Sequence, residues 1–82
     1  MMVTAFVMVN VGVGYFRKVY PRTTYKEKIK KLPGVKEVHL IMGRYDLLVH
    51  IEAKTLDEIF QLVDDEIRSI PGVNATETFM AF

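Results

Sequence analysis

The chain contains the same helix-to-strand junction twice, and this repeat constrains its fold more than any other feature. Residues 29–35 read IKKLPGV, and residues 67–73, which lie 38 positions later, read IRSIPGV. In each copy proline stops a helix, glycine takes the turn and valine opens a strand. The sequence therefore predicts two helix-to-strand units in one chain.

A strand-like segment precedes each unit and completes the order of elements. Residues 3–9 are apolar and β-branched, and residues 47–53 alternate between apolar and polar side chains. The resulting order is that of the α+β ferredoxin-like fold, βαββαβ, in which a four-stranded antiparallel sheet carries two helices on one face. With 82 residues, the chain is expected to form a single domain over residues 1–82.

The sequence predicts the start and the apolar face of the second helix more clearly than those of the first. Thr55 and Glu58 fit a capping box at its start. Thr24 and Glu27 offer another box for the first helix, where Pro21 breaks an earlier helical run. One apolar stripe is predicted along the second helix: Leu56, Ile59, Phe60, Val63, Ile67 and Ile70.

Alternation along the strands assigns side chains to the two faces of the sheet. Val7, Leu40, Met42 and Phe79 are among those expected under the helices, whereas Asp46, Thr76 and Thr78 fall on the uncovered face. Large apolar groups on an uncovered face, each worth about 1.5–3 kcal/mol when buried, favour self-association. We therefore predict a homodimer through this face, with an interface of Phe6, Met8, His39, Ile41, Leu48, His50 and Met80.

Two histidines on the uncovered face raise the alternative of a metal site. His39 and His50 lie near Glu37 and Glu52 in one plausible register, and these are side chains that bind zinc. Two such ligands often occur together by chance, and histidine also suits a half-buried interface. We therefore expect neither a metal nor another cofactor.

A tight hairpin is expected around Gly43, where glycine accepts a positive φ. Its outward N–H groups could bind a carboxylate, Asp46 could bind an ammonium group, and Thr76 and Thr78 offer hydroxyls. This combination suits a small zwitterion. The alternative is an ordinary hairpin with a capping aspartate.

Residues 32–59 read LPGVKEVHLIMGRYDLLVHIEAKTLDEI, and residues 67–80 read IRSIPGVNATETFM. These two segments resemble the effector-binding domain of the Lrp/AsnC family of feast/famine regulators. The resemblance implies dimerisation through the sheets, further assembly into octamers, and amino acids bound between dimers. It implies a ligand site of Gly43, Arg44, Tyr45, Asp46, Thr76 and Thr78.

The chain has no room for the helix-turn-helix domain of full-length family members, so it resembles the stand-alone form of the domain. Full-length Lrp/AsnC regulators are possible partners, and direct nucleic-acid binding is not expected. The hypothesis is a non-enzymatic module that binds an amino-acid effector and oligomerises. It would regulate transcription or amino-acid metabolism indirectly, through assembly.

Residues 12–17, GVGYFR, provide the alternative of an enzyme. They resemble the phosphate-binding loop of acylphosphatases, in which an arginine corresponding to Arg17 holds the phosphate. Tyr15 is an insertion that would redirect this arginine, and the asparagine that orients water there is missing. We expect a turn and a helix start, with no catalysis by Gly12–Arg17.

The distribution of charge is uneven, although the formal net charge is only +1. Residues 17–31 contain seven basic side chains and one acid, whereas residues 55–70 contain five acids and one arginine. The basic helix could contact phosphates, but the acidic helix opposes nucleic-acid binding. Helices of different subunits could instead attract each other.

The chain has no cysteine, signal peptide or membrane-length apolar run, so we expect a cytoplasmic protein with no membrane partner.

Overall fold

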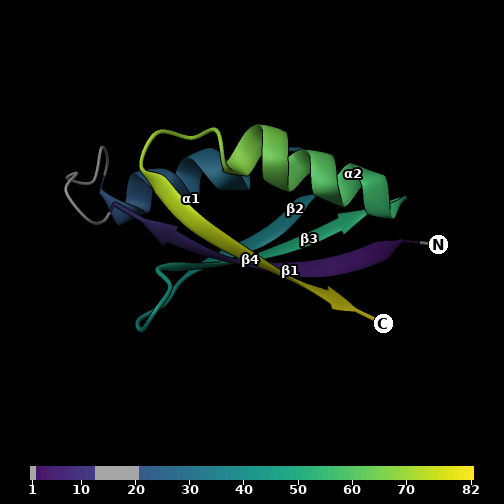
Figure 1. Ribbon diagram of the computed structural model, residues 1–82, viewed down its shortest axis with the longest axis horizontal. Coiled ribbons are helices and arrows are strands. Elements are labelled where there is room, and N and C mark those ends of the chain that lie inside the picture. The colour runs from purple at the N-terminus through teal and green to yellow at the C-terminus, as the bar shows by residue number, and fades with distance from the viewer. Residues whose placement is uncertain (1, 13–20) are drawn as a thin grey trace.

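The computed structural model describes residues 2–12 and 21–82 and has the expected order of elements. A four-stranded antiparallel sheet has the order β2-β3-β1-β4. Both helices lie on one side of this sheet (Figure 1), which confirms the ferredoxin-like α+β fold. The elements are β1 (Val3–Val11), α1 (Arg22–Lys30), β2 (Val35–Leu40), β3 (Leu47–Ala53), α2 (Leu56–Gln61), the π-helix η1 (Leu62–Ile67) that continues it, and β4 (Val73–Ala81).

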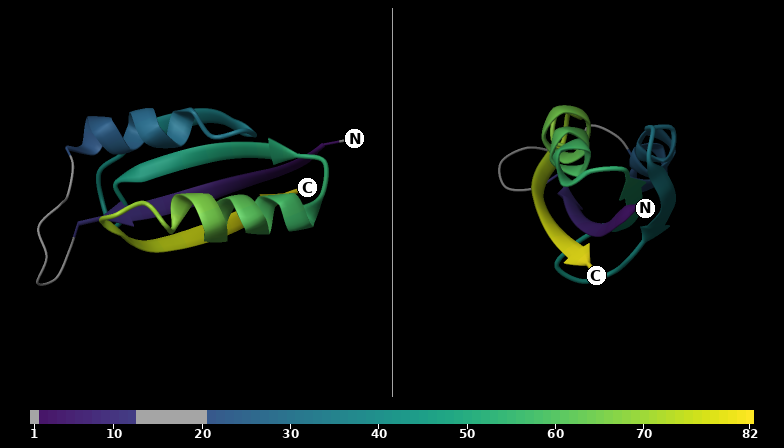
Figure 2. Two further views of the ribbon diagram at one scale, coloured as in Figure 1. Left: turned by 90° about the horizontal axis from the view of Figure 1, so that it is seen from above. Right: turned by 90° about the vertical axis from the view of Figure 1, so that its right-hand side faces the viewer.

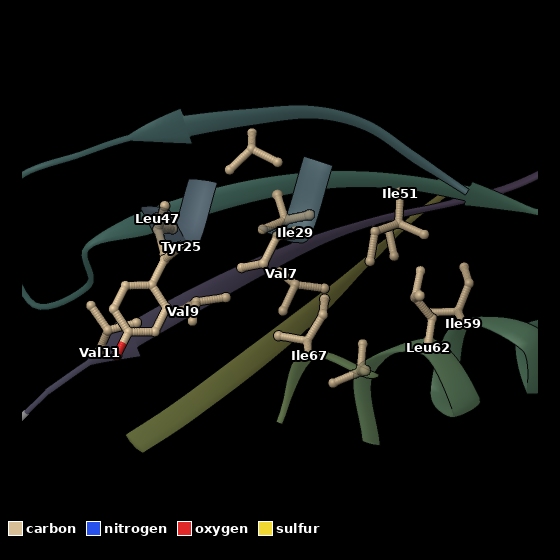
Figure 3. Close-up of a cluster of buried hydrophobic side chains, with 14 residues drawn as sticks. Val7, Val9, Val11, Tyr25, Ile29, Leu47, Ile51, Ile59, Leu62 and Ile67 are labelled. Carbon is tan, nitrogen blue, oxygen red and sulfur yellow. The ribbon is translucent and has the colours of Figure 1, made fainter. Parts of the chain in front are cut away.

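The core lies between the helix layer and the central strands, and Figure 2 shows the two helices side by side above the sheet. Buried side chains from β1 and β3 meet buried side chains from both helices (Figure 3). Removal of this apolar surface from water is the main stabilising term of the fold. The largest fully buried side chains are Tyr25, Ile29, Leu47, Ile51, Ile59, Ile67, Val7, Val9, Val11 and Val49.

The two helix starts differ in how well the sequence predicts them. Thr55 is the N-cap of α2, and its hydroxyl accepts from the Glu58 N–H at 3.2 Å, as predicted. The capping box at Thr24 is wrong, because α1 already begins at Arg22 with Pro21 as its N-cap residue. The earlier helical run at residues 16–20 lies outside the described residues.

The apolar stripe of the second helix is only partly correct. Leu56 and Phe60 are 44% and 48% exposed, whereas Leu62 is buried. The helix widens after Gln61, so that the Arg68 N–H donates to the Val63 carbonyl at 2.9 Å. This π-helical spacing rotates the following side chains relative to a regular α-helix.

Strand β4 carries the main error in the predicted faces. Asn10 pairs with Ala75 but Val11 pairs with Val73, so Asn74 is an extra residue in β4. A bulge of this kind exchanges the two faces for the rest of the strand.

The bulge corrects four assignments. Met80 lies opposite Ala5 and packs against the core, so its place in the predicted uncovered interface is wrong. Thr76 and Thr78 lie opposite the buried Val9 and Val7, on the helix-covered side. Phe79 lies opposite Phe6 on the uncovered face instead.

Leu40 and Met42 are also not buried as predicted. Leu40 is 42% exposed, and Met42 is 93% exposed because β2 ends at Leu40 and the chain leaves the sheet there. Figure 1 shows the connection between β2 and β3 extending away from the sheet on the side opposite the helices.

Candidate ligand-binding site

The hairpin of residues 41–46 is fixed at its base and projects at its tip. The Ile41 N–H donates to the Asp46 carbonyl at 2.9 Å, and the Asp46 N–H donates to the Val9 carbonyl of β1 at 2.8 Å. Gly43 has φ +139°, and a side chain there would meet open space. The backbone conformation therefore favours glycine at this position, whereas the space around it would accept a side chain.

Asp46 joins three parts of the structure. One carboxylate oxygen, Oδ2, accepts from the Val11 N–H at 2.9 Å, and the other, Oδ1, pairs with the Arg22 guanidinium at 2.7 Å. The residue is 6% exposed. A ligand ammonium would therefore compete with Arg22 for this carboxylate, and Asp46 has a structural role that the sequence showed only as the alternative of a capping aspartate.

Tyr45 reaches across β1 to the far edge strand. Its hydroxyl donates to Oε1 of Glu77 on β4 at 2.8 Å. Glu77 lies opposite Met8, on the uncovered face. The hydrogen bond to Glu77 raises the pKa of the Tyr45 phenol, desolvation and the charge of Glu77 add to the rise, and the positive charge of Arg44 partly offsets it.

Two asparagines complete what we call the hairpin polar cluster, namely Asn10, Arg44, Tyr45, Asn74 and Glu77. Asn10 Nδ2 donates to the Arg44 carbonyl at 2.9 Å, and Asn74 Nδ2 donates to Asn10 Oδ1 at 3.3 Å. The Arg44 guanidinium forms no ion pair with any residue that the structure describes. Sequence reasoning missed both asparagines and Glu77. The sequence does contain a clue for Asn10, because alternation along the first strand places its polar side chain on the uncovered face.

The predicted threonines do not join this cluster. Thr76 and Thr78 flank Glu77 in β4, so their side chains lie on the other side of the sheet. The structure brings together Gly43, Arg44, Tyr45 and Asp46, and it separates them from the threonine pair.

The rest of the uncovered face is apolar and aromatic with a polar border. The Phe6 and His50 rings stack with centroids 4.9 Å apart, and Phe79 is 49% exposed opposite Phe6. Met8, Leu48 and His39 share this face through their register, and Ile41 is half-buried where the hairpin begins.

Carboxylates surround the two histidines. Glu37 Oε1 lies 3.5 Å from His39 Nε2 and 4.0 Å from His50 Nδ1, and Glu52 Oε2 lies 3.4 Å from His50 Nε2. Over residues 2–12 and 21–82, no group of three or more such side chains is arranged to hold a metal ion. Among the same residues no helix is long and apolar enough to cross a membrane.

Comparison with known families decides the assignment. The model of the Lrp/AsnC ligand binding domain matches residues 4–82. The chain belongs to the Lrp/AsnC ligand-binding domain family. The fold described above is that of this ligand-binding domain.

Relatives of this Lrp/AsnC domain include longer proteins. An uncharacterised HTH-type transcriptional regulator of Pyrococcus abyssi is 45% identical over 56 residues, which are 68% of this chain and 37% of the regulator. The chain thus spans little more than a third of that relative. A homocitrate synthase of Sulfolobus acidocaldarius is 38% identical over 72 residues, which are 88% of this chain but 15% of the enzyme.

Solved structures also match the domain, one of them of similar size and one about twice as long. A protein of Thermus thermophilus has a TM-score of 0.83 at 34% identity, with 98% of this chain and 92% of that chain covered. A transcriptional regulator of Neisseria meningitidis, solved in complex with L-Met, has a TM-score of 0.80 at 20% identity, with 98% of this chain and 49% of that chain covered. The latter likeness shows the shared fold.

The acylphosphatase alternative depends on a loop that lies mostly outside the described residues. Gly12 is described, and its N–H donates to the Gly72 carbonyl at 2.6 Å, but residues 13–17 are not. The named regulators among the relatives and the matched domain point to a binding domain.

Proposed function

We propose that this Lrp/AsnC domain is a non-catalytic module that binds an amino-acid-like effector and self-assembles. The observation that carries the proposal is the hairpin polar cluster beside an apolar sheet face. It combines an Arg44 guanidinium that forms no ion pair among the described residues with a Glu77 carboxylate. The Tyr45 phenol donates to Glu77 and also lies close enough to Arg44 to be affected by its charge. A cation and an anion within one cluster suit a zwitterion.

Each group of the ligand has a partner of the right chemistry. Arg44 binds the effector carboxylate, because a guanidinium donates two parallel hydrogen bonds to a carboxylate, and the exposed backbone at Gly43 adds N–H donors. Glu77 accepts from Tyr45 through one oxygen and can take the effector ammonium through the other. Asp46 supports the hairpin and can share the ammonium only if Arg22 moves.

The threonine pair enters this site only from a neighbouring copy. Because Thr76 and Thr78 lie on the side of β4 opposite Glu77, one ligand cannot contact both the phenol of Tyr45 and these hydroxyls on a single face. We propose that the hairpin of one copy and the threonines of another enclose the effector, which makes ligand binding depend on assembly.

The uncovered face supports the first step of assembly, a homodimer. Phe6 and Phe79 are adjacent and partly exposed there, with Met8 and Leu48 beside them. Apolar surface gathered on one face is the usual mark of an interface. Assembly to octamers, as the family resemblance implies, would then bring hairpins and threonine pairs of different dimers together.

Two comparisons support a transferable effector module. A regulator with the same fold was solved with L-Met, and a related segment makes up 15% of a homocitrate synthase. An effector at a subunit boundary shifts the assembly equilibrium by its differential affinity for the assembled state. The module would thereby act on partners such as full-length Lrp/AsnC regulators, without contacting nucleic acid itself.

A thermal-shift screen against the twenty amino acids, paired with light scattering, tests this function. We expect at least one amino acid to raise the melting temperature. Arg44→Gln should abolish that shift, and Lys31→Gln, an exposed charge away from the cluster, should keep it. Phe79→Asp should reduce the dimer to monomers. The binding proposal fails if no amino acid shifts the parent, and the interface proposal fails if the parent is monomeric at every concentration.

A further inference from the structure

Four titratable side chains form a continuous row near the β2 edge of the uncovered face. Glu37 Oε1 lies 3.5 Å from His39 Nε2 and 4.0 Å from His50 Nδ1. On the other side of the His50 ring, Nε2 lies 3.4 Å from Glu52 Oε2. Base and acid therefore alternate along what we call the His–Glu row, and the proposed effector site uses none of its four members.

The net charge of the His–Glu row depends on pH. Histidine is the side chain that ordinarily changes its charge between about pH 5 and 8, whereas glutamate generally stays negative there. The row holds two glutamates and two histidines. It is therefore negative when both rings are neutral, and it has no net charge when both are protonated. Each imidazolium then lies beside a carboxylate, with which it forms a charge-assisted hydrogen bond.

His50 ties the row to the apolar part of the face. It lies on the central strand β3, its side chain is 23% exposed, and its ring stacks on Phe6 of β1 with an angle of 16° between the ring planes. Phe79 lies opposite Phe6 on the next strand. A partner sheet that covers these two phenylalanines also covers His50, and it removes water from Glu37 and Glu52 beside that ring.

The charged groups around the row ordinarily keep their charge over the same pH range. On the β1 side, His50 and Glu52 lie opposite the uncharged Phe6 and Thr4. Among the residues that the structure describes, no lysine or arginine forms an ion pair with the row. The neighbouring charges are Lys26, Glu27 and Lys30 of α1, which line a pocket with Glu37 and His39, then Lys36 of β2, and Arg44 and Glu77 of the hairpin polar cluster.

We infer that the His–Glu row makes the proposed sheet-face dimer pH-dependent, with protonation of His39 and His50 favouring the dimer. When the histidines are neutral, dimerisation takes carboxylates without cationic partners out of water and brings two negative faces together. Both effects oppose association.

At lower pH the row enters the interface as a set of neutral pairs. Each carboxylate then has a cationic partner, and the His50 imidazolium is also attracted to the face of the Phe6 ring. The dimer therefore binds more protons than two monomers do, so its dissociation constant falls as the pH falls. Because the proposed effector site forms between copies, acidification would also favour effector binding without changing a residue of that site.

Fluorescence-detected sedimentation of the labelled full chain, diluted over a wide range of concentration, tests the inference. The measurements are made without amino acids, with EDTA and at fixed ionic strength, at about pH 5.5 and about pH 8. We expect the monomer–dimer dissociation constant of the parent to be at least about tenfold lower at the acidic pH. Circular dichroism at both pH values checks that the chain is folded.

Two double variants separate charge from shape. His39→Gln combined with His50→Gln removes the titrating groups, so its two dissociation constants should agree within about threefold. Glu37→Gln combined with Glu52→Gln removes the charges that oppose association, so it should dimerise more tightly than the parent at about pH 8 and gain nothing on acidification. Glu66→Gln removes an exposed acid of η1, on the helix side, and should keep the parental pH dependence.

Three results would overturn the inference. They are a parental dissociation constant that is unchanged or rises on acidification, a folded double-histidine variant that keeps the parental pH dependence, and a folded double-glutamate variant that is no tighter than the parent at about pH 8. The inference rests on the proposed dimer, and the two fail differently. A parent that is monomeric at every pH and concentration overturns the dimer as well, whereas a dimer without pH dependence leaves the dimer and the effector site intact.

Discussion

Replacement of Asp46 by alanine should weaken the fold, because this carboxylate joins the hairpin, the end of β1 and the start of α1. The substitution leaves the Val11 N–H without its acceptor, and Val11 is only 1% exposed. It also frees the Arg22 guanidinium, whose side chain is 42% exposed and can therefore recover hydration.

These contacts set the size of the effect. A buried N–H without a partner costs about 1–3 kcal/mol. The ion pair with the half-exposed arginine adds about 0–1 kcal/mol. The expected loss in the free energy of unfolding is therefore about 1–4 kcal/mol. For a domain of this size each kcal/mol lowers the melting temperature by about 4–8 °C, which gives a decrease of about 4–32 °C.

Urea denaturation followed by circular dichroism measures this loss, at one fixed protomer concentration because self-assembly couples stability to concentration. Asp46→Asn keeps an oxygen that can accept from the Val11 N–H, so it should cost about 1 kcal/mol. Arg22→Gln should cost no more than about 1 kcal/mol. Asp46→Ala within about 0.5 kcal/mol of Asp46→Asn would refute the reasoning, because the buried N–H would then carry no penalty.

Two further predictions concern backbone strain and ionisation. Gly72→Ala should lower the free energy of unfolding in urea by at least about 1–2 kcal/mol more than Gly43→Ala does. Both glycines have positive φ, but a Cβ at Gly72 would lie 1.7 Å from the Tyr25 hydroxyl oxygen, whereas Gly43 faces open space. Equal losses would show that Tyr25 moves away freely. Glu77→Gln should lower the pKa of Tyr45 toward its ordinary value in an alkaline absorbance titration, since Glu77 raises it. The sign follows from the raised pKa: the Tyr45–Glu77 contact stabilises the fold below the ordinary tyrosine pKa and is lost as pH rises through the raised one. An unchanged titration would mean that Glu77 does not control the phenol.

Several parts of the hairpin site could be read from the sequence, but their roles could not. The glycine turn and the Tyr-Asp pair are local, and they indicated a projecting hairpin. Asp46 was predicted to face a ligand, yet its carboxylate binds a backbone N–H 35 positions away in the chain. No local pattern marks such a partner, because any of several strand ends could have supplied it.

The order of strands and helices could be predicted from the sequence. The signals that set it, namely the Pro-Gly pairs that end the helices, the alternation along the strands and the helix cap, each act over only a few residues. The tertiary structure decided which side chains share a face of β4. A single extra residue, Asn74, is accommodated as a bulge against β1, and it moves Met80, Thr76 and Thr78 to the helix side and Phe79 to the open side. Alternation has a period of two, so one inserted residue reverses every later assignment, and only the pairing of β4 with β1 shows where that insertion falls.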